Sequence, residues 1–417
     1  MSGLRAGVNA RGVYIKVECR VMPTRREIFQ SLAAAVAAGR FVNGSTRDVP
    51  AQASPGGSGA AASAPPVNLF DYEDLARKRL PSMAYEYIAG GAGDEVTLRD
   101  NRSRFDSLKL KPRVLRDVSH LDTSTTLFGQ RLDYPILLAP TAYHKITHPE
   151  GEAATARGAG AAHATMCVSS FATTSIEDVA KAATGPLWFQ LYVQPDRGFT
   201  KALVQRAETA GCRALLVTVD TPVLGTRNRE TRAGFRLPPG MERENLKGLV
   251  GNASTTAHVD EGTIYSAIFD PKLTWAGIEW IRSFAKIPVL LKGILTPEDA
   301  ALAVQHGADG IVVSNHGARN LDTVPATITA LPGVATAVGG KIPVLMDGGI
   351  RRGTDVVKAL ALGARAVLIG RPYLWGLSVD GADGVRSVMT ILRSEFQAAM
   401  ALCGHTSLKT IDKSVLW

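Results

Sequence analysis

Eight short apolar segments recur between residues 134 and 371, and a stretch with helical periodicity follows each of them. Each segment is continuously apolar and rich in Val, Ile and Leu, which is typical of parallel strands whose sheet is covered on both faces. A count of eight predicts an α/β fold of the TIM-barrel, (β/α)8, type. A doubly wound open sheet is the alternative, but no G-x-G-x-x-G motif follows the first strand. The expected strands are residues 134–140, 165–170, 187–192, 214–220, 287–293, 310–315, 342–348 and 366–371.

An extension precedes the eight strand-and-helix units, and an insertion interrupts them. Helical patterns at residues 71–80 and 82–93 predict an N-terminal helical extension ahead of the first strand. After the fourth strand, residues 225–275 contain Gly-, Pro-, Asn- and Ser-rich stretches, which predicts a lid over the mouth of the barrel. We therefore expect residues 67–417 to form one barrel domain.

Residues 1–66 have the composition of a leader and a flexible linker. Residues 51–66 are almost entirely Gly, Ser, Ala and Pro, and such a segment has nothing to bury. The pair Arg25-Arg26, the weakly apolar stretch after it and the A-x-A sequence at residues 51–53 resemble a twin-arginine export signal. An organelle transit peptide, or an extension of a cytoplasmic protein without targeting function, explains the leader equally well. No segment is predicted to cross a membrane, and the final residues 414–417 are not a peroxisomal signal.

The net charge of +9 does not indicate a nucleic-acid-binding protein. Residues 1–66 hold eight Lys and Arg against three Asp and Glu, so the leader contributes +5 and the rest of the chain +4. No basic run with interleaved aromatic residues occurs in the body, so we expect no nucleic-acid partner. The cysteines lack the spacing of metal ligands, so we predict neither a metal site nor disulfides; they are Cys19, Cys167, Cys212 and Cys403.

The loop after the sixth expected strand holds a base and a fixed cation, His316 and Arg319, three residues apart. Gly317 between them allows a tight turn in which both side chains face one small anion. Such a pair suits a 2-hydroxy acid, because Arg binds the carboxylate while His removes a proton from the adjacent carbinol carbon or its hydroxyl. An isolated His-x-x-Arg is more often structural. Here, however, polar residues follow all eight strands at the end where barrel enzymes build their sites.

Glycines after the seventh and eighth strands predict a phosphate pocket. Backbone N–H groups near the start of a helix at residues 353–354, with Arg351 and Arg371 alongside, are suited to binding a phosphate. Lys292, at the end of the fifth strand, is suited to stabilising negative charge on a reduced flavin ring. The alternative for Lys292 is an ion pair with a carboxylate at a neighbouring strand end.

These motifs resemble the FMN-dependent 2-hydroxy-acid oxidases and dehydrogenases, a family that includes glycolate oxidase and lactate oxidase. The resemblance runs from about Asn68 to near Lys413, and its motifs are residues 148–152, 190–192, 218–222, 314–322 and 347–355. It implies that His316 is the catalytic base, that Asp220 holds its ring, and that Tyr192 contacts the substrate hydroxyl. It further implies that Tyr87, Arg227 and Arg319 bind the substrate. The cofactor implied is FMN, in contact with Pro140, Thr141, Ala142, Ser169, Gln190, Tyr192, Thr218, Lys292, Ser314, Asp347, Gly348, Gly349, Ile350, Arg351, Gly370 and Arg371.

The resemblance predicts oxidation of an (S)-2-hydroxy acid to the 2-oxo acid, with electrons passed to oxygen or a quinone-type acceptor. Phe171 stands where glycolate oxidases typically have Trp, so a wider substrate pocket favours lactate or medium-chain acids over glycolate. The family also implies a homo-oligomer, a tetramer. The rival functions are a flavin-dependent isomerase on a phosphate-binding barrel and a non-catalytic flavoprotein scaffold.

Overall fold

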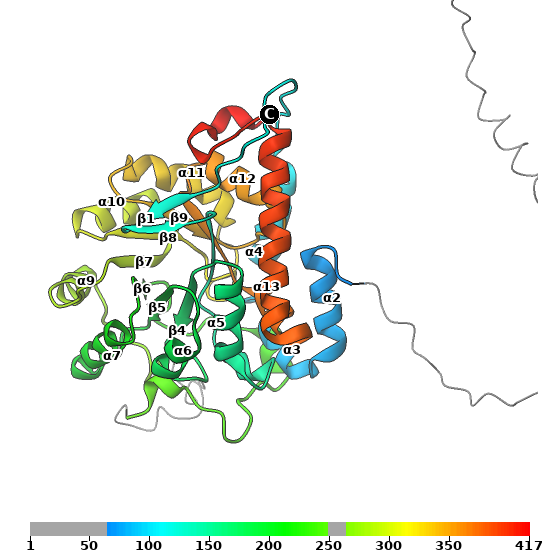
Figure 1. Ribbon diagram of the computed structural model, residues 1–417. Coiled ribbons are helices and arrows are strands. Elements are labelled where there is room, and N and C mark those ends of the chain that lie inside the picture. Colours follow the sequence, from blue (N-terminus) through cyan, green and yellow to red (C-terminus); the bar gives the residue numbers. More distant parts are fainter. Residues whose placement is uncertain (1–64, 249–263) are drawn as a thin grey trace, which may run out of the picture. The chain divides into compact units, whose positions relative to one another are not determined.

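The structure, a computed structural model, describes residues 65–248 and 264–417 (Figure 1). The predicted leader and the centre of the predicted lid insertion therefore lie outside the described residues.

Eight parallel strands form a closed barrel, which confirms the predicted fold. Neighbours in the barrel are consecutive in the chain, and β10 closes the ring by pairing with β3, Leu368 opposite Leu137. The order is β10-β3-β4-β5-β6-β7-β8-β9. The strands are β3 (Ile136–Leu138), β4 (Met166–Ser169), β5 (Leu187–Leu191), β6 (Leu215–Thr218), β7 (Val289–Ile294), β8 (Gly310–Val313), β9 (Val344–Asp347) and β10 (Ala366–Ile369).

Helices follow the strands and cover the outside of the barrel (Figure 1). They are α5 (Gly151–Ala161), α6 (Ile176–Ala182), α7 (Arg197–Thr209), α9 (Trp275–Arg282), α10 (Pro297–Gln305), α11 (Thr327–Val338), α12 (Gly353–Ala361) and α13 (Arg371–Leu402). The insertion adds α8 (Asn228–Arg232). Short 3-10 turns are η1 (His144–Ile146), η2 (Glu244–Leu246), η3 (Leu408–Thr410) and η4 (Lys413–Val415).

The predicted helical extension is present and comprises α2 (Leu69–Arg79), α3 (Ser82–Ala89) and α4 (Val96–Ser107). Asn68 caps α2, because its side chain accepts hydrogen bonds from the first backbone N–H groups of the helix. Helix α2 packs against the long helix α13, which also covers α5 (Figure 1). This packing brings the α3 end of the extension, with Tyr87, beside the barrel mouth.

Alternation along the strands divides the core into two layers. One set of side chains, including Leu137, Trp188 and Leu290, fills the barrel interior, while the intervening set packs under the helices. A hairpin of β1 (Thr125–Leu127) and β2 (Gln130–Leu132) adds Leu127 and Leu132 to the interior cluster. The barrel therefore has a filled interior, and a cavity lies at its C-terminal end.

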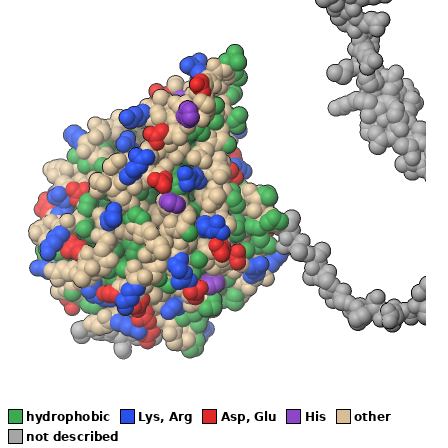
Figure 2. Space-filling model, viewed as in Figure 1, with side chains coloured by type: hydrophobic (Ala, Val, Ile, Leu, Met, Phe, Trp, Pro, Cys, Tyr) green, Lys and Arg blue, Asp and Glu red, His purple; other side chains and the backbone are tan. Residues whose placement is uncertain are grey.

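The strands are shorter than predicted. Strands β5, β8 and β10 begin at the predicted residue but end one or two residues early, while β7 begins later and ends one residue beyond the predicted end. The hairpin, helix α4 and the full length of α13 were not predicted. Helix α13 continues through a kink at Asp380 and Gly381, where the backbone leaves helical geometry. Among the described residues, no helix is both long and apolar enough to span a bilayer. Charged side chains of both signs are interspersed over the face in Figure 2.

Candidate active site

A cavity of about 710 Å³ lies at the C-terminal ends of the strands. Its wall combines strand-end residues with Tyr87 from α3 and with described parts of the insertion, from Leu224 to Arg243 and at Ile264 and Phe269. The volume falls within the range of small-molecule sites, about 300 to 1,000 Å³. The described part of the insertion therefore covers the barrel mouth, as predicted.

An unusual backbone holds His316 in this cavity. Three consecutive residues, His316, Gly317 and Ala318, have positive φ angles of 58°, 62° and 62°. Asn315 anchors the turn, because its side chain exchanges two hydrogen bonds with Asn101 of α4 and also accepts one from the Ala318 N–H. A non-glycine residue in this region is strained and is often found at functional sites, so the histidine is held in place by the surrounding contacts.

A buried chain of hydrogen bonds fixes the imidazole. His316 Nδ1 lies 2.8 Å from Asp220 Oδ1, and Nε2 lies 3.1 Å from the Tyr192 hydroxyl. Burial opposes ionisation of Asp220, but His316 beside it holds the pKa of the carboxyl below its usual value. The carboxylate can only accept, so Nδ1 carries the proton and Nε2 of the neutral ring is left as a base facing the cavity. Burial lowers the pKa of His316, while Asp220 opposes that shift, so the ring is neutral near pH 7.

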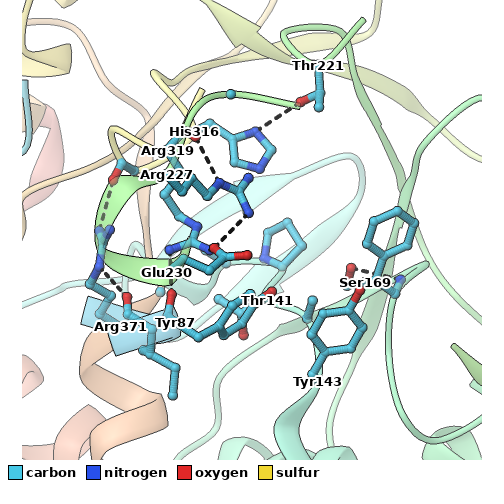
Figure 3. Close-up of a pocket in the computed structure, with 18 of the residues that line it drawn as sticks. Tyr87, Thr141, Tyr143, Ser169, Thr221, Arg227, Glu230, His316, Arg319 and Arg371 are labelled. Carbon is cyan, nitrogen blue, oxygen red and sulfur yellow. Dashed lines mark hydrogen bonds and ion pairs between the residues drawn. The ribbon is translucent and has the colours of Figure 1, made fainter. Parts of the chain in front are cut away.

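The cationic end of the cavity contains Arg319 and Arg227. Arg319 donates to the backbone carbonyls of Tyr87 and Gly90, and its guanidinium lies 4.8 Å from the centre of the Tyr87 ring. Glu230 Oε2 lies 3.2 Å from Arg319 Nη2 and 3.4 Å from Arg227 Nη1 (Figure 3). A carboxylate of the protein therefore already occupies the side of Arg319 that faces Arg227.

Side chains of β4, β5 and β6 form a polar network on the cavity wall. Gln190 accepts a hydrogen bond from the Ser169 hydroxyl at 3.0 Å and donates one to Thr218 at 2.9 Å. Because the amide oxygen and the amide nitrogen each have a hydrogen-bond partner, the orientation of the Gln190 amide is determined. This arrangement presents polar groups of fixed orientation to a planar ligand in the cavity.

Lys292 lies between a carboxylate and a hydroxyl. Its ammonium is 3.1 Å from Asp347 Oδ2 and donates to Ser314 Oγ at 2.9 Å. The ion pair that was the alternative for Lys292 is thus present, but Lys292 also lines the cavity. Asp347 Oδ1 is buried without a hydrogen-bond partner among the described residues. An orphaned acceptor and a buried ammonium fit a ligand that carries both donor and acceptor groups, as the flavin ring of FMN does.

The turn after β9, where an anion pocket was predicted, lies in the cavity wall. Gly349 has a φ of 79°, and a Cβ there would clash with the backbone oxygen of Asn101, so no other residue fits. Burial lowers the pKa of Arg351 to about 10 and that of Arg371 to about 9. The hydrogen bonds found for Arg371 go to the carbonyls of Ile88, Gly90 and Gly317. Two desolvated arginines beside a glycine turn fit the phosphate of FMN.

The cavity brings together all the predicted site residues except Asp220 and Ser314. Asp220 lies behind His316, which agrees with its predicted role as a support for the ring. Ser314 is buried, and its hydroxyl accepts from Lys292 and from the His316 N–H. Ser314 therefore does not line the cavity, and its contact with the cofactor stays a prediction.

Several wall residues were not predicted, among them Tyr143, Glu230, Phe235 and Arg243. Glu230 follows Arg227 by three residues, a spacing that places two side chains on one face of a helix and could have revealed it. Arg243 and Phe235 belong to the insertion, where irregular backbone gives no periodicity from which a facing side could be read. Thr221 and Asn320, which hydrogen-bond Asp220, were also missed.

Fold and cavity together define a flavin-binding barrel oxidoreductase. Residues 76–417 match the family model of FMN-dependent dehydrogenases. The chain is 50% identical over 357 residues to L-lactate oxidase from Nostoc sp., covering 84% of this chain and 98% of that protein. It is 48% identical over 349 residues to glycolate oxidase from Spinacia oleracea, covering 84% and 95%. A crystal structure of mandelate oxidase with (S)-2-phenylpropionate superposes with a TM-score of 0.76 at 42% identity, over 85% and 98% of the two chains.

The chain therefore belongs to the family of FMN-dependent 2-hydroxy-acid oxidases and dehydrogenases. The predictions of family, FMN cofactor and oxidoreductase activity are confirmed, and the isomerase and scaffold alternatives are not favoured.

Proposed function

We propose that this protein oxidises an (S)-2-hydroxy acid to the 2-oxo acid and passes the two electrons to oxygen. The observation that carries the proposal is the imidazole of His316, held at Nδ1 by Asp220 while Nε2 faces the same cavity as Arg319. The hydroxy acid loses two electrons and two protons, and oxygen takes up both to give hydrogen peroxide. Three relatives named as lactate and glycolate oxidases support oxygen as the acceptor.

In this proposal His316 Nε2 removes a proton from the carbinol carbon or its hydroxyl. The imidazolium that forms is stabilised by Asp220, and the low exposure of both side chains, 16% and 14%, strengthens this attraction. The Tyr192 hydroxyl lies 3.1 Å from His316 Nε2. When substrate is bound, this hydroxyl is placed to donate to the substrate hydroxyl rather than to His316.

Arg319 and Arg227 bind the substrate carboxylate, and Tyr87 stacks against the Arg319 guanidinium. Burial raises the pKa of Tyr87 and of Tyr192, so both phenols remain neutral donors at every relevant pH. Because both arginines bind the substrate carboxylate, the neighbouring carbinol carbon is held in a fixed position relative to His316.

FMN supplies, when bound, the acceptor for the two electrons of the substrate. Lys292 and the network around Gln190 would hold its ring, and Arg351, Arg371 and the turn at residues 347–351 would hold its phosphate. The aromatic wall that includes Phe171, Tyr143 and Phe235 excludes water from the reacting atoms.

The substrate favoured within this class is lactate or a medium-chain acid. Phe171 lies 4.6 Å from Tyr192 between ring centres, so it forms the wall next to the group that would bear the substrate hydroxyl. A single ring changes selectivity by about 1 to 3 kcal/mol, so glycolate is expected to react more slowly rather than to be excluded.

We also propose the domain division that the sequence indicates, a leader and linker at residues 1–66 and a catalytic domain at residues 67–417. A tetrameric assembly and the cellular destination of the chain stay predictions from the resemblance and from the leader.

The test is anaerobic flavin reduction by L-lactate, glycolate and a longer 2-hydroxy acid, followed in the visible spectrum. Bleaching supports the reaction, and reoxidation on admission of air with formation of peroxide supports the oxidase. His316→Gln should retain FMN but lower the reduction rate by about 10²- to 10⁴-fold. Fast reduction in that variant removes His316 from the mechanism, and a flavin that no hydroxy acid bleaches would return the function to the isomerase or scaffold.

A further inference from the structure

A buried histidine that no step of the proposed reaction uses lies directly behind the cavity wall. His144, in η1, is 1% exposed and does not line the cavity. Its Nε2 lies 2.7 Å from the Thr141 hydroxyl, and its Nδ1 lies 2.9 Å from the hydroxyl of Thr155 on α5. Thr141, by contrast, lines the cavity just after β3 (Figure 3). His144 therefore connects an outer helix to a residue that is expected to contact FMN.

A buried tyrosine from the start of α13 completes this hydrogen-bond network. The Tyr373 hydroxyl is hydrogen-bonded to the Thr141 hydroxyl and donates to the Ala139 carbonyl at 2.8 Å. The same hydroxyl lies 3.4 Å from His144 Nε2, and the two rings pack edge to face with 5.6 Å between their centres. The Thr141 hydroxyl is thus held from behind the wall by two side chains that do not line the cavity.

The number of available hydrogens fixes the direction of these hydrogen bonds. A carbonyl oxygen can only accept, so Tyr373 gives its single hydroxyl hydrogen to Ala139. The hydrogen bond between the two hydroxyls must then use the hydrogen of Thr141, and the contact with His144 must use a hydrogen on Nε2. Thr141 is therefore left with no hydrogen to donate to a ligand, but its oxygen has a second lone pair that can still accept.

The histidine end of the network agrees with this direction. Burial lowers the pKa of His144, although Glu152 opposes that shift, so the ring is neutral near pH 7 and carries one N–H. With this hydrogen on Nε2, Nδ1 accepts from the Thr155 hydroxyl at 2.9 Å, a shorter contact than the 3.3 Å between that hydroxyl and the Gly151 carbonyl. Every hydrogen of the network then has an acceptor.

We propose that His144 and Tyr373 are positioning residues that hold the Thr141 hydroxyl as a hydrogen-bond acceptor towards the flavin ring of FMN. Reduction by two electrons gives the ring an N–H group that the oxidised ring lacks, so an acceptor in the wall favours the reduced form. The network therefore raises the reduction potential of the bound cofactor. This inference concerns the cofactor of the family and does not depend on which substrate is oxidised.

The test is the midpoint potential of FMN bound to the full chain, measured against a reference dye during slow reduction by xanthine oxidase, without any hydroxy acid. Thr141→Val removes the hydroxyl and keeps the shape of the side chain, while Tyr373→Phe frees the Thr141 hydrogen. Each variant should lower the ratio of reduced to oxidised FMN at a fixed potential by about tenfold. For a two-electron couple this change corresponds to about 30 mV. The double variant should match Thr141→Val alone, because Tyr373 acts only through Thr141.

A matched control and a conservative variant separate this role from a structural one. Tyr134 is also buried, and its hydroxyl donates to the Ala162 carbonyl at 2.7 Å, but it does not line the cavity or contact Thr141. Tyr134→Phe should therefore leave the potential unchanged. His144→Gln, which keeps an N–H donor, should retain a potential closer to that of the wild-type protein than His144→Leu does.

An unchanged or raised potential in Thr141→Val overturns the inference, because the hydroxyl then does not accept from the ring. A further shift from Tyr373→Phe in the Thr141→Val background, or an equal shift in Tyr134→Phe, also overturns it and makes Tyr373 a structural support of the wall. The dissociation constant of oxidised FMN, followed by flavin fluorescence, should change little in Thr141→Val, since the expected loss falls on the reduced form.

Discussion

Replacement of Asp220 by Asn separates the charge of this side chain from its shape. Donors from His316, Thr221 and Asn320 all lie within 3.3 Å of Asp220 Oδ1, whereas Oδ2 has no hydrogen-bond partner among the described residues. An asparagine should therefore place its carbonyl oxygen at the Oδ1 position and its amide group at the Oδ2 position. The imidazole would keep its tautomer, with the proton on Nδ1, and only the negative charge would be lost.

The size of the effect follows from the loss of this charge when the imidazolium forms. Two unit charges about 4 Å apart at an effective dielectric constant of about 20 attract each other by about 4 kcal/mol. Each 1.36 kcal/mol corresponds to about a factor of ten in rate, so Asp220→Asn should slow flavin reduction by about 10³-fold. Because Asp220 does not line the cavity, the substrate dissociation constant should change much less than the rate.

The assay is anaerobic stopped-flow reduction with L-lactate, carried out on the single variants at residues 220 and 316 and on the double variant. If Asp220 acts only through His316, Asp220→Asn should have little additional effect in the His316→Gln background. A loss of less than about tenfold in the Asp220→Asn variant with FMN bound would refute stabilisation of the imidazolium. Equal losses in both backgrounds would place the role of Asp220 elsewhere, for example in the fold of the loop around Asn320.

Glu230→Gln should tighten L-lactate binding several-fold, since removal of a carboxylate near Arg319 and Arg227 lessens repulsion of the substrate. Weaker binding measured by flavin titration would show instead that Glu230 orders the two arginines. For pH dependence, burial lowers the pKa of His316 below its ordinary value of 6.5, so the acid limb of kcat/KM should lie below pH 6.5. The Asp220→Asn variant should shift that limb to still lower pH, because the carboxylate raises the pKa of His316; a limb that moves upward contradicts the proposed pairing.

The sequence predicts most of the barrel because buried parallel strands must be apolar along their whole length. The eight segments were recognised on that ground, although their boundaries were too wide. The length of α13 was not predicted; its two helical segments meet at a kink where the backbone of Asp380 and Gly381 is not helical, and the element packs against α2 and α5. Ser314 illustrates a second limit, because a strand-end position does not reveal whether a hydroxyl faces the cavity or the neighbouring Lys292.

The side chains of the insertion are the part of the cavity wall that the sequence predicts least well, and we expect them to affect substrate selectivity. The C-terminal ends of the strands can be located from the apolar segments. His316, Lys292 and Arg371 were therefore placed at the barrel mouth from the sequence. Glu230 lies on the short helix α8 and Arg243 on irregular backbone, and their positions in the cavity wall follow only from contacts such as those with Arg319 and Tyr143. In barrel enzymes the catalytic groups lie at the ends of rigid strands, while the loops tune which ligand enters. The charged side chains that the insertion adds to the cavity wall, Arg227 and Glu230 among them, are therefore expected to tune which substrate binds.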